Sequence, residues 1–293
     1  MHTSRDTQRQ IHIALTFDDN FWAPTYATMR GICATTSERE NVHFHLIHTG
    51  LGDDRIERLS SVTQEFGARI NYYDISTNDI LRDKINSFPK IRSRNLNDIV
   101  YARLFLCEIL PVEIEKIIYI DSDILVRVAI EEFYDMDLEG KVVAAANCPH
   151  RVMFQSTRDV TPKSYFQTDA PYFNAGFLLI DAEKYRKIDF AAAVRENVKE
   201  TQRIQLYYDQ DILNIALRGN WKILDWRWNL QNPLPHHESF DPKIIHYTGS
   251  NKPWRLFSST AFKRQYRHTM TNDVFYRFMR ERWVRTIRSW LRR

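Results

Sequence analysis

Two aspartates one residue apart follow a hydrophobic segment in the middle of the chain. Asp121 and Asp123 come directly after residues 117–120 (Ile-Ile-Tyr-Ile). If that segment is a buried strand, both carboxylates lie just past its carboxyl end, where ligands bind in open α/β sheets. Carboxylate oxygens favour Mg²⁺ or Mn²⁺, and such an ion neutralises charge that develops on a departing nucleoside diphosphate. An isolated Asp-x-Asp is also typical of a solvated turn, so the preceding segment is what favours a cation site.

A histidine, a glycine and a lysine follow another strand-like segment near the C-terminus. Residues 243–247 (Lys-Ile-Ile-His-Tyr) include His246, and Gly249 and Lys252 come next. The imidazole of His246 is a candidate third metal ligand. Lys252 would meet a phosphate as a point charge, and Gly249 would let backbone N–H groups approach closely. Taken alone, His246 reads as an ordinary strand-end histidine, and we assign no role to the other nine histidines.

Further polar side chains adjoin three segments. Residues 11–17 run into Asp18, Asp19 and Asn20, which suit hydrogen bonds to a base and ribose, although Asp19 or Asn20 suits a helix cap equally well. Residues 172–176 (Tyr-Phe-Asn-Ala-Gly) lead into an apolar run, and residues 208–211 (Tyr-Asp-Gln-Asp) open a helical pattern. These amides and carboxylates suit sugar hydroxyls, although either aspartate of the second group also suits a helix cap.

Strand-like and helical segments alternate along the chain, which predicts an α/β fold with a mixed, mostly parallel sheet. The expected strands are residues 11–17, 42–48, 69–75, 116–120, 141–146, 176–180, 221–224 and 243–247. The expected helices are residues 24–36, 99–110, 181–202 and 209–218. Prolines at 149, 162 and 171 with weak periodicity between them predict a long loop, a common place for a lid.

The composition indicates a globular protein with a sizeable core. The 293 residues are 43% hydrophobic and 27% charged, and the longest apolar runs fall far short of the roughly 20 residues of a membrane span. Residues 1–10 are polar without an apolar segment behind them, so we expect a cytoplasmic protein. Cys33, Cys107 and Cys148 are odd in number and widely separated, which predicts buried thiols and no disulfide framework.

The net charge of +4 is concentrated at the C-terminus. Residues 273–293 hold seven arginines against two acids, a balance of +5, so the rest of the chain is near −1. This distribution argues against a nucleic-acid-binding face. The same segment carries hydrophobic residues at helical spacing, namely Phe275, Phe278, Met279, Trp283, Ile287, Trp290 and Leu291. It predicts a basic amphipathic helix that lies on an anionic membrane, or alternatively one that packs on its own core.

With these residues identified, the chain resembles the retaining glycosyltransferases of family eight, especially the bacterial lipooligosaccharide α-galactosyltransferases and glucosyltransferases. The resemblance spans roughly residues 11–254. Its ordered motifs are residues 18–20 (Asp-Asp-Asn), 101–104 (Tyr-Ala-Arg-Leu), 119–123 (Tyr-Ile-Asp-Ser-Asp), 173–176 (Phe-Asn-Ala-Gly), 209–214 (Asp-Gln-Asp-Ile-Leu-Asn) and 246–254 (His-Tyr-x-Gly-x-x-Lys-Pro-Trp). It implies a GT-A fold, which is Rossmann-like, with its sheet flanked by helices.

The resemblance also implies roles for individual residues. Mn²⁺, or Mg²⁺ in its place, would be held by Asp121, Asp123 and His246. A UDP-sugar donor would be bound at ten further positions, which are Thr16, Asp18, Asn20, Phe21, Arg103, Ser122, Asn174, Ala175, Gly249 and Lys252. Asp209 and Gln210 would be the catalytic residues, with Gln210 at the face where a nucleophile is expected. At position 21 this chain has Phe where a Tyr is common, and the loop after Asn147 does not match.

An amide such as that of Gln210 is a poor nucleophile, so we favour a front-face substitution in which the leaving phosphate helps to deprotonate the acceptor. The resemblance implies transfer of galactose or glucose to an oligosaccharide acceptor, expected to be the lipid-linked core of bacterial lipopolysaccharide. Residues 11–256 would form the catalytic domain after a polar tail of residues 1–10. Residues 257–293 would associate with the cytoplasmic face of the inner membrane.

Two other classes of protein are compatible with parts of the pattern. Haloacid-dehalogenase phosphatases also begin with a hydrophobic strand and Asp-x-Asp, but that family wants Thr or Val where this chain has Leu125. A non-catalytic nucleotide-sugar sensor could use the same fold, since fold alone does not establish turnover. The presence of all three expected metal ligands and Lys252 favours an enzyme.

Overall fold

The computed structural model describes residues 9–88, 98–148, 171–196 and 208–291. Its strands are β1 (Ile11–Phe17), β2 (Val42–His48), β3 (Arg69–Asp74), β4 (Lys116–Ile120), β5 (Ile124–Val126), β6 (Val143–Asn147), β7 (Phe173–Asp181), β8 (Trp221–Leu224), β9 (Leu230–Gln231) and β10 (Ile244–His246). Most of the expected loop at 149–171, most of the N-terminal tail and the end of the expected helix at 181–202 lie outside the described residues.

The helices alternate with these strands in the first part of the chain. They are α1 (Trp22–Thr35), α2 (Asp53–Phe66), α3 (Asp79–Asn86), α4 (Leu106–Ile109), α5 (Glu131–Tyr134), α7 (Ala182–Arg186), α8 (Phe190–Glu196), α10 (Tyr208–Ala216), α11 (Lys263–Met270) and α12 (Asn272–Leu291). The 3₁₀ helices are η1 (Asp19–Phe21), η2 (Arg39–Asn41), η3 (Ile75–Thr77), η4 (Asp98–Phe105), η5 (Trp226–Trp228) and η6 (Pro235–Ser239).

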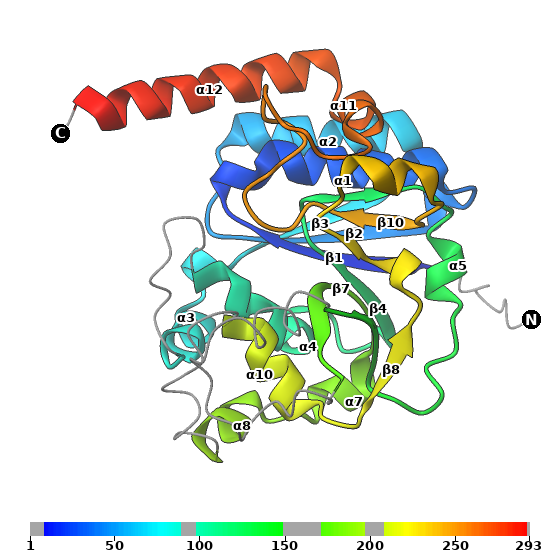
Figure 1. Ribbon diagram of the computed structural model, residues 1–293. Helices are drawn as coiled ribbons and strands as arrows, with labels where there is room; N and C mark the ends of the chain where they lie inside the picture. Colours follow the sequence, from blue (N-terminus) through cyan, green and yellow to red (C-terminus); the bar gives the residue numbers. More distant parts are fainter. Residues whose placement is uncertain (1–8, 89–97, 149–170, 197–207, 292–293) are drawn as a thin grey trace, which may run out of the picture.

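A seven-stranded sheet forms the centre of the molecule, in the order β3-β2-β1-β4-β7-β6-β8 (Figure 1). Strands β3, β2, β1 and β4 are parallel, β7 runs antiparallel to both β4 and β6, and β8 is parallel to β6. The predicted mixed, mostly parallel sheet is therefore confirmed. Because β1 and β4 are parallel neighbours, the residues that follow Phe17 and Ile120 meet at one edge of the sheet.

A smaller sheet of three strands lies beside that edge, in the order β5-β10-β9. Strand β5 begins directly after the Asp121-Ser122-Asp123 turn, and β10 pairs with it antiparallel so that His246 is opposite Ile124. This pairing brings a residue from the end of the chain beside the two aspartates. The small sheet is thus the element that assembles the predicted metal ligands.

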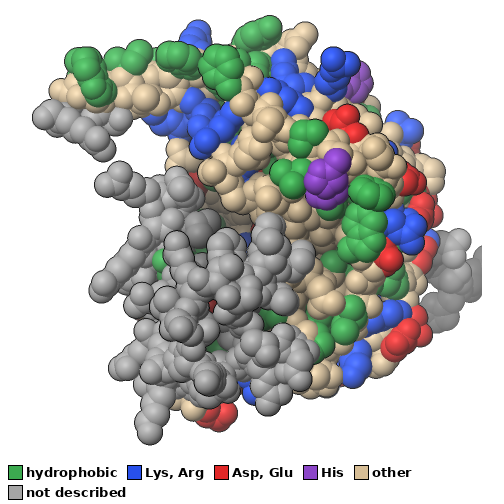
Figure 2. All heavy atoms as spheres, in the orientation of Figure 1, with side chains coloured by type: hydrophobic (Ala, Val, Ile, Leu, Met, Phe, Trp, Pro, Cys, Tyr) green, Lys and Arg blue, Asp and Glu red, His purple; other side chains and the backbone are tan. Residues whose placement is uncertain are grey.

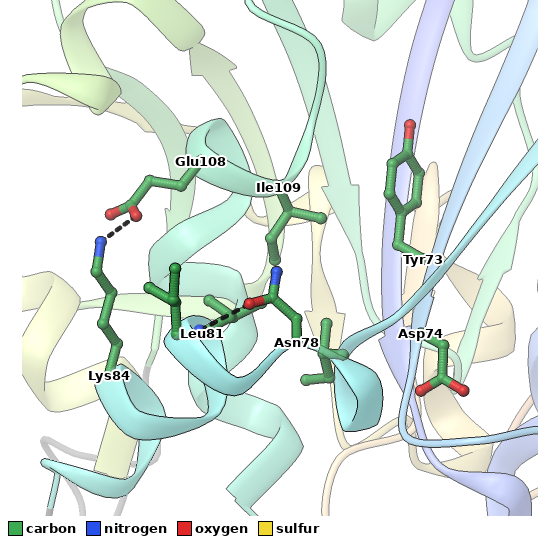
Figure 3. A pocket seen from close by; sticks show the side chains of 9 residues that line it. Tyr73, Asp74, Asn78, Leu81, Lys84, Glu108 and Ile109 are labelled. Carbon is green, nitrogen blue, oxygen red and sulfur yellow. Dashed lines mark hydrogen bonds and ion pairs between the residues drawn. The ribbon is translucent and has the colours of Figure 1, made fainter.

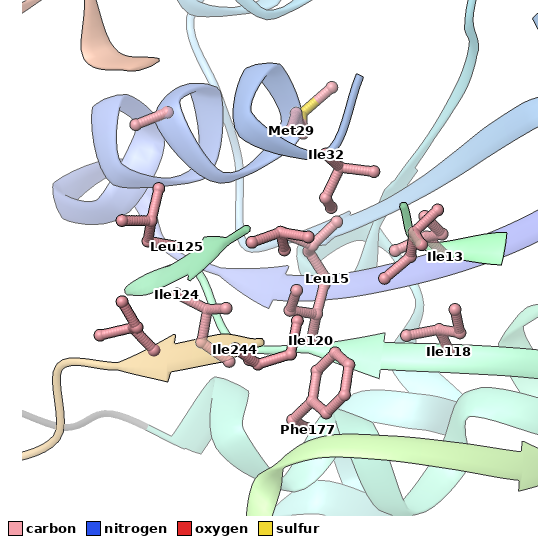
Figure 4. Packing of buried hydrophobic residues seen from close by; sticks show 14 of the residues in the cluster. Ile13, Leu15, Met29, Ile32, Ile118, Ile120, Ile124, Leu125, Phe177 and Ile244 are labelled. Carbon is pink, nitrogen blue, oxygen red and sulfur yellow. The ribbon is translucent and has the colours of Figure 1, made fainter. Parts of the chain in front are cut away.

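Two hydrophobic clusters lie on opposite faces of the large sheet. Alternate residues of β1 divide between them, with Ile13 and Leu15 in one and Ala14 in the other. In Figure 4, Ile32 projects from α1 toward the strands of the first cluster. Burial of each Ile or Leu side chain contributes about 1.5–3 kcal/mol to the free energy of folding. The central strands therefore hold the residues at their ends in fixed positions.

The expected helix at residues 99–110 was wrong in type. The structure has the 3₁₀ helix η4 over Asp98–Phe105 and only a short α4 after it. Six of the eight η4 residues are buried, so this segment lacks the exposed face of an amphipathic α-helix. The Nε atom of Arg103 also donates to the carbonyl oxygen of Val100 at 3.2 Å, which competes with regular helical hydrogen bonding.

The expected helix at residues 181–202 is also interrupted, because Lys187–Asp189 separate α7 from α8. Asp181 caps α7 by accepting a hydrogen bond from the backbone of Lys184. By contrast, α1 runs from Trp22 to Thr35, close to the prediction, with Pro24 in its first turn as expected.

The C-terminal helices lie against α1 and α2 (Figure 1). Val274, Phe275 and Phe278 of α12 belong to the first hydrophobic cluster, whereas Trp290 near its end is 75% exposed. The first half of this helix therefore packs on the core, and its second half extends past the body of the molecule. Among the described residues, no helix is both long and apolar enough to cross a membrane.

Candidate active site

Asp121 and Asp123 occupy the turn between β4 and β5. The backbone N–H of Asp121 donates to the carbonyl of Gly176 on β7 at 2.8 Å, and the carbonyl of Asp123 accepts from Tyr247 at 3.1 Å. The turn is thus held from both sides by backbone hydrogen bonds. The Asp123 side chain is buried and that of Asp121 is partly exposed, so the pair lies at the boundary between core and solvent.

His246 completes a cluster with the two aspartates. Its Nε2 atom is 3.2 Å from Oδ1 of Asp123 and 3.6 Å from Oδ2 of Asp121. On the other side of the ring, Nδ1 faces amide oxygens of Asn174 at 3.1 Å and Asn229 at 3.2 Å. Oxygen atoms therefore face both ring nitrogens; with the proton on Nδ1, the lone pair of Nε2 would be free to bind a cation held between the carboxylates.

This arrangement fits a divalent cation. One ligand atom from each of Asp121, Asp123 and His246 lies within 4.8 Å of the others. A lone pair facing two carboxylates is unfavourable unless a positive charge lies between them, and a cation supplies that charge. Hydrogen bonds from Nδ1 to the two amide oxygens would fix the tautomer of the ring, as is usual for metal-ligating histidines. Two carboxylates and one imidazole suit Mn²⁺ or Mg²⁺ with positions remaining for phosphate oxygens.

Lys252 lies against the same cluster. Its Nζ atom donates to Oδ2 of Asp123 and, at 2.5 Å, to the carbonyl oxygen of Tyr247. Burial of Asp123 opposes its ionisation, but interactions with Lys252 and His246 outweigh burial and lower the pKa of Asp123. The carboxylate is therefore ionised and available as a ligand at neutral pH, with an ammonium group beside it to meet a phosphate.

Arg103 connects the metal side of the site to α10. Its Nη2 atom is 3.0 Å from Asp121, its Nε atom is 2.8 Å from Asp209, and Nη1 donates to the carbonyl of Ala175 at 2.9 Å. Burial lowers the pKa of Arg103, but Asp121 and Asp209 outweigh it and raise that pKa. For Asp209, burial dominates over the attraction of Arg103 and raises the pKa to about 6.

Three neighbouring residues form hydrogen bonds with the side-chain amide of Gln210. Its Oε1 atom accepts from Asn174 Nδ2 and from the backbone of Ala175, both at 3.0 Å, and its Nε2 atom donates to the hydroxyl of Tyr172 at 3.1 Å. Gln210, Asn174 and Ala175 are all buried. The network fixes the amide side chains beside the carboxylate cluster, and their contact with a sugar stays a prediction.

Three of the residues predicted to bind the UDP-sugar donor lie at or just past the end of β1. The hydroxyl of Thr16 is 2.8 Å from the hydroxyl of Tyr119, which in turn donates to Asp121 at 2.8 Å. Asp18 accepts from the backbone of Asn20 at 2.9 Å, so Asp18 caps η1, and the expected cap by Asp19 or Asn20 was wrong. Arg285 of α12 donates to the side-chain oxygen of Asn20.

The other predicted donor contacts occupy different surroundings. The ring centroids of Phe21 and Trp254 lie 6.1 Å apart, with the rings edge to face. Trp254 follows Lys252 by two residues. The hydroxyl of Ser122 is 2.8 Å from that of Thr25 on α1, so this side chain ties the turn to the helix. Gly249 has φ +73°, a conformation that strains other residues.

Sequence reasoning missed three residues that shape the site. Tyr119 hydrogen-bonds Asp121, Asn229 hydrogen-bonds His246, and Gly176 approaches both ligands. A Cβ atom on Gly176 would overlap the His246 ring and lie 2.5 Å from Oδ2 of Asp121. Tyr119 and Gly176 lie within recognised motifs and could have been included, whereas Asn229 carries no local signal.

A pocket of about 310 Å³ lies elsewhere, beside α3 and α4 (Figure 3). Its lining includes Asn78, which caps α3 through Leu81, and an ion pair between Lys84 and Glu108. None of the predicted site residues lines it. Its polar groups are thus engaged in structural contacts.

The fold and the acidic site together define a glycosyltransferase with a GT-A fold. The chain belongs to glycosyl transferase family 8, whose model matches residues 12–257. This membership argues against the phosphatase alternative.

The names of similar proteins state several different transferase activities. The probable galacturonosyltransferase-like 4 of Arabidopsis thaliana is 28% identical over 85% of this chain and 75% of its own length. The lipopolysaccharide 1,2-glucosyltransferase of Escherichia coli is 22% identical over 92% of this chain and 80% of its own. The crystal structure of the galactosyltransferase LgtC in complex with donor and acceptor sugar analogs superimposes with a TM-score of 0.74 at 23% identity, over 89% of this chain and 95% of that one. This likeness confirms the predicted GT-A fold.

Proposed function

We propose that this glycosyltransferase is a retaining, Mn²⁺-dependent hexosyltransferase that moves galactose or glucose from a UDP-sugar to a saccharide acceptor. The observation that carries the proposal is the convergence of Asp121, Asp123 and Nε2 of His246, with Lys252 beside them. Mg²⁺ could take the place of Mn²⁺ at such a site. The bound cation would neutralise charge on the diphosphate as it leaves.

The remaining predicted residues would position the donor around this centre. Lys252 would add a point charge at the phosphates, and the backbone at Gly249 would approach them closely. Thr16, Asp18, Asn20 and Phe21 would surround the uridine, with Ser122 at the turn. Arg103, Asn174, Ala175, Asp209 and Gln210 would line the sugar. Each assignment extends the family resemblance to the matching position of this chain.

The charge distribution supports a neutral hexose. Arg103 is already compensated by Asp121 and Asp209, and Lys252 by Asp123. The described part of the predicted donor-sugar pocket therefore offers no uncompensated cation for the carboxylate of a uronic acid. A galactose or glucose hydroxyl, which can donate to carboxylates and amide oxygens, suits these groups better.

The hydrogen bonds of Gln210 support a front-face mechanism. Its Oε1 atom already accepts two hydrogen bonds, and an amide is a weak nucleophile in any case. In this mechanism the acceptor hydroxyl attacks from the side on which the diphosphate leaves, and a phosphate oxygen takes its proton. Gln210 and the carboxylate of Asp209 would stabilise positive charge that develops on the sugar. A covalent glycosyl adduct on either residue would contradict this mechanism.

Lipopolysaccharide glycosyltransferases among the relatives suggest a lipid-linked core oligosaccharide as the acceptor. The exposed end of α12 supports docking at an anionic membrane, at the cytoplasmic face of the inner membrane. Figure 2 shows hydrophobic side chains along the outer edge of the helix, with Lys or Arg nearby. Trp283, Ile287 and Trp290 are each more than half exposed. Their insertion together with arginine attraction to headgroups would hold the enzyme near its acceptor.

Vesicle sedimentation tests the membrane part of the proposal. Truncation before α12 would remove core residues, so the better variant replaces Ile287, Trp290 and Leu291 with Ser. We expect at least roughly tenfold weaker binding to phosphatidylglycerol vesicles, since three apolar side chains no longer insert. A Trp226→Ser control, which alters an exposed tryptophan elsewhere, should bind as wild type does. Equal binding by the triple variant would exclude docking through this helix end.

A donor panel tests the enzymatic proposal. The protein is mixed with Mn²⁺ and either UDP-galactose, UDP-glucose or UDP-galacturonate, and released UDP is measured. We expect release from a neutral hexose donor, including slow hydrolysis without acceptor, and little from the uronate. Tight UDP-sugar binding with no release from any donor, with or without saccharide acceptors, would favour the sensor alternative.

A further inference from the structure

Three histidines lie together on the large sheet, at the end opposite the candidate active site. His43 and His45 are two residues apart on β2, so their side chains share one face of the sheet. His12 on β1 is paired with His43 in the parallel register. A His-x-His pair on one strand and a histidine on its neighbour therefore place three imidazoles side by side.

The imidazole nitrogens converge. Nδ1 of His12 is 3.0 Å from Nε2 of His45, and one nitrogen from each of the three rings lies within 4.8 Å of the others. The edge between two nitrogens around a tetrahedral zinc ion is about 3.3 Å, given Zn–N bonds of about 2.0–2.1 Å. The observed spacing therefore needs only small side-chain shifts to surround a cation.

Polar groups outside the cluster orient its rings. The hydroxyl of Tyr73 lies 3.0 Å from Nδ1 of His45, the ring nitrogen that does not face His12. This is the outer contact that usually fixes a metal-ligating imidazole. His43 has amide oxygens at both nitrogens, from Gln10 at 3.2 Å and Asn71 at 3.0 Å.

The contacts of His43 leave one lone pair available. A neutral imidazole has a single N–H, so only one of the two amide oxygens can accept from it. The other amide oxygen faces the lone pair of the second ring nitrogen, and the two repel each other. The repulsion is removed if the ring moves so that this lone pair binds a cation. The remaining acceptor would then hold the ring in place.

We propose that His12, His43 and His45 form a second metal site, selective for Zn²⁺, that clamps β1 to β2. Three nitrogen ligands suit Zn²⁺ better than Mn²⁺, whereas the carboxylate-rich site at Asp121 and Asp123 has the opposite preference. Water or the Gln10 oxygen would take the fourth position. Because His12 and His43 are partly exposed, the ion can enter from solvent.

This site is independent of the proposed transferase activity. His12 and Thr16 are four residues apart on β1, a separation of about 13 Å along the strand. Zinc at the three histidines is therefore expected to stabilise the sheet without contacting a donor sugar. Loss of the zinc site would leave UDP release unchanged, and loss of activity would leave the zinc site intact.

Zinc titration of metal-stripped, full-length protein tests the proposal. The Asp123→Asn variant serves as the background because it lacks one ligand of the other site. We expect one zinc ion per chain by equilibrium dialysis and elemental analysis. Adding His43→Gln, a substitution at a partly exposed position, should weaken zinc binding on the order of 100-fold or more. His236→Gln, at an exposed histidine, should not change it.

Two further measurements make the result specific. The variants should keep the circular dichroism of the parent, which separates lost ligands from lost folding. X-ray absorption of the bound zinc should show three imidazole nitrogens. Zinc affinity that is unchanged by His43→Gln, or no zinc bound by the folded background variant, would overturn the proposal.

Discussion

The Nε atom of Arg103 lies 2.8 Å from Oδ2 of Asp209 in the interior of the protein. The same guanidinium holds Asp121 through its Nη2 atom at 3.0 Å. One side chain therefore links a candidate metal ligand to the start of α10. This link makes the position of the carboxylate cluster depend on the packing of η4, the segment that carries Arg103.

Replacement of Arg103 by Met should therefore be costly to stability. The change leaves the buried Asp209 and the partly exposed Asp121 without their partner, and loss of a partner by a buried charge destabilises by about 3–5 kcal/mol. Urea denaturation at pH 7 measures this change. Arg103→Lys keeps the charge but not the fork of donors, so it should retain more stability than Arg103→Met and still lose activity. Arg82→Met, which removes an exposed ion pair, is the control and should have a much smaller effect. Equal stability of Arg103→Met and wild type would show that the buried link contributes nothing.

Gly176→Ala should damage the metal site more than the fold. The added methyl group would overlap the His246 ring and crowd Asp121, so the ligands must move apart. We expect Mn²⁺ affinity to fall by roughly 10–100-fold, the range for disturbed ligand orientation, with near-native circular dichroism. Gly31→Ala is the matched control, because its Cβ would meet Thr269 at an ordinary 3.4 Å. Wild-type Mn²⁺ affinity in Gly176→Ala would mean that the ligands do not converge as described.

Much of this site could be predicted because its residues lie at strand ends and in ordered motifs. Asp121, Asp123 and His246 come from segments that are hydrophobic and short, so their placement at a sheet edge follows from the sequence pattern. Asn229 could not be found in this way, since only the pairing of β9 with β10 brings its segment to His246. The same reason explains the three-histidine cluster, which depends on the register between β1 and β2.

The type of the segment at residues 98–105 was the clearest error in the predicted fold. Its apolar residues are typical of a helix, but burial on nearly all sides removes the periodicity that separates α from 3₁₀ winding. Hydrogen bonding by Arg103 and packing of Tyr101 and Leu104 decide the local geometry. These are tertiary interactions, so the helix type cannot be predicted from local propensity alone.

The three-histidine cluster predicts acid sensitivity in metal-free protein. Burial lowers the pKa of His12 from 6.5 to about 4 and that of His45 to about 3. The unfolded chain therefore binds protons first as the pH falls below 6.5, so stability is present at neutral pH and is lost toward pH 4. Between pH 7 and 5, the buried His45 contributes a loss of up to about 2 kcal/mol, and the partly exposed His12 contributes less because solvent screens it.

Urea denaturation in EDTA at pH 7 and pH 5 checks this prediction. His12→Gln should lose less stability than wild type over the same interval, by roughly 1 kcal/mol, because this position no longer titrates and solvent screening reduces its contribution. His236→Gln should follow wild type. If His12→Gln and wild type lost the same stability on acidification, the histidine would not be buried in its neutral form.

The central claim is that Asp121, Asp123 and His246 hold a cation that binds the diphosphate of the donor. Calorimetric titration of UDP into metal-stripped protein, with and without Mn²⁺, tests it most directly. We predict that Mn²⁺ tightens UDP binding at least roughly tenfold in wild type, since an ion held by these three residues would attract the phosphates. Asp123→Asn should abolish this effect, and Asp225→Asn, at an exposed aspartate, should preserve it. Equal UDP affinity with Mn²⁺ and with EDTA in the folded wild-type protein would contradict the claim.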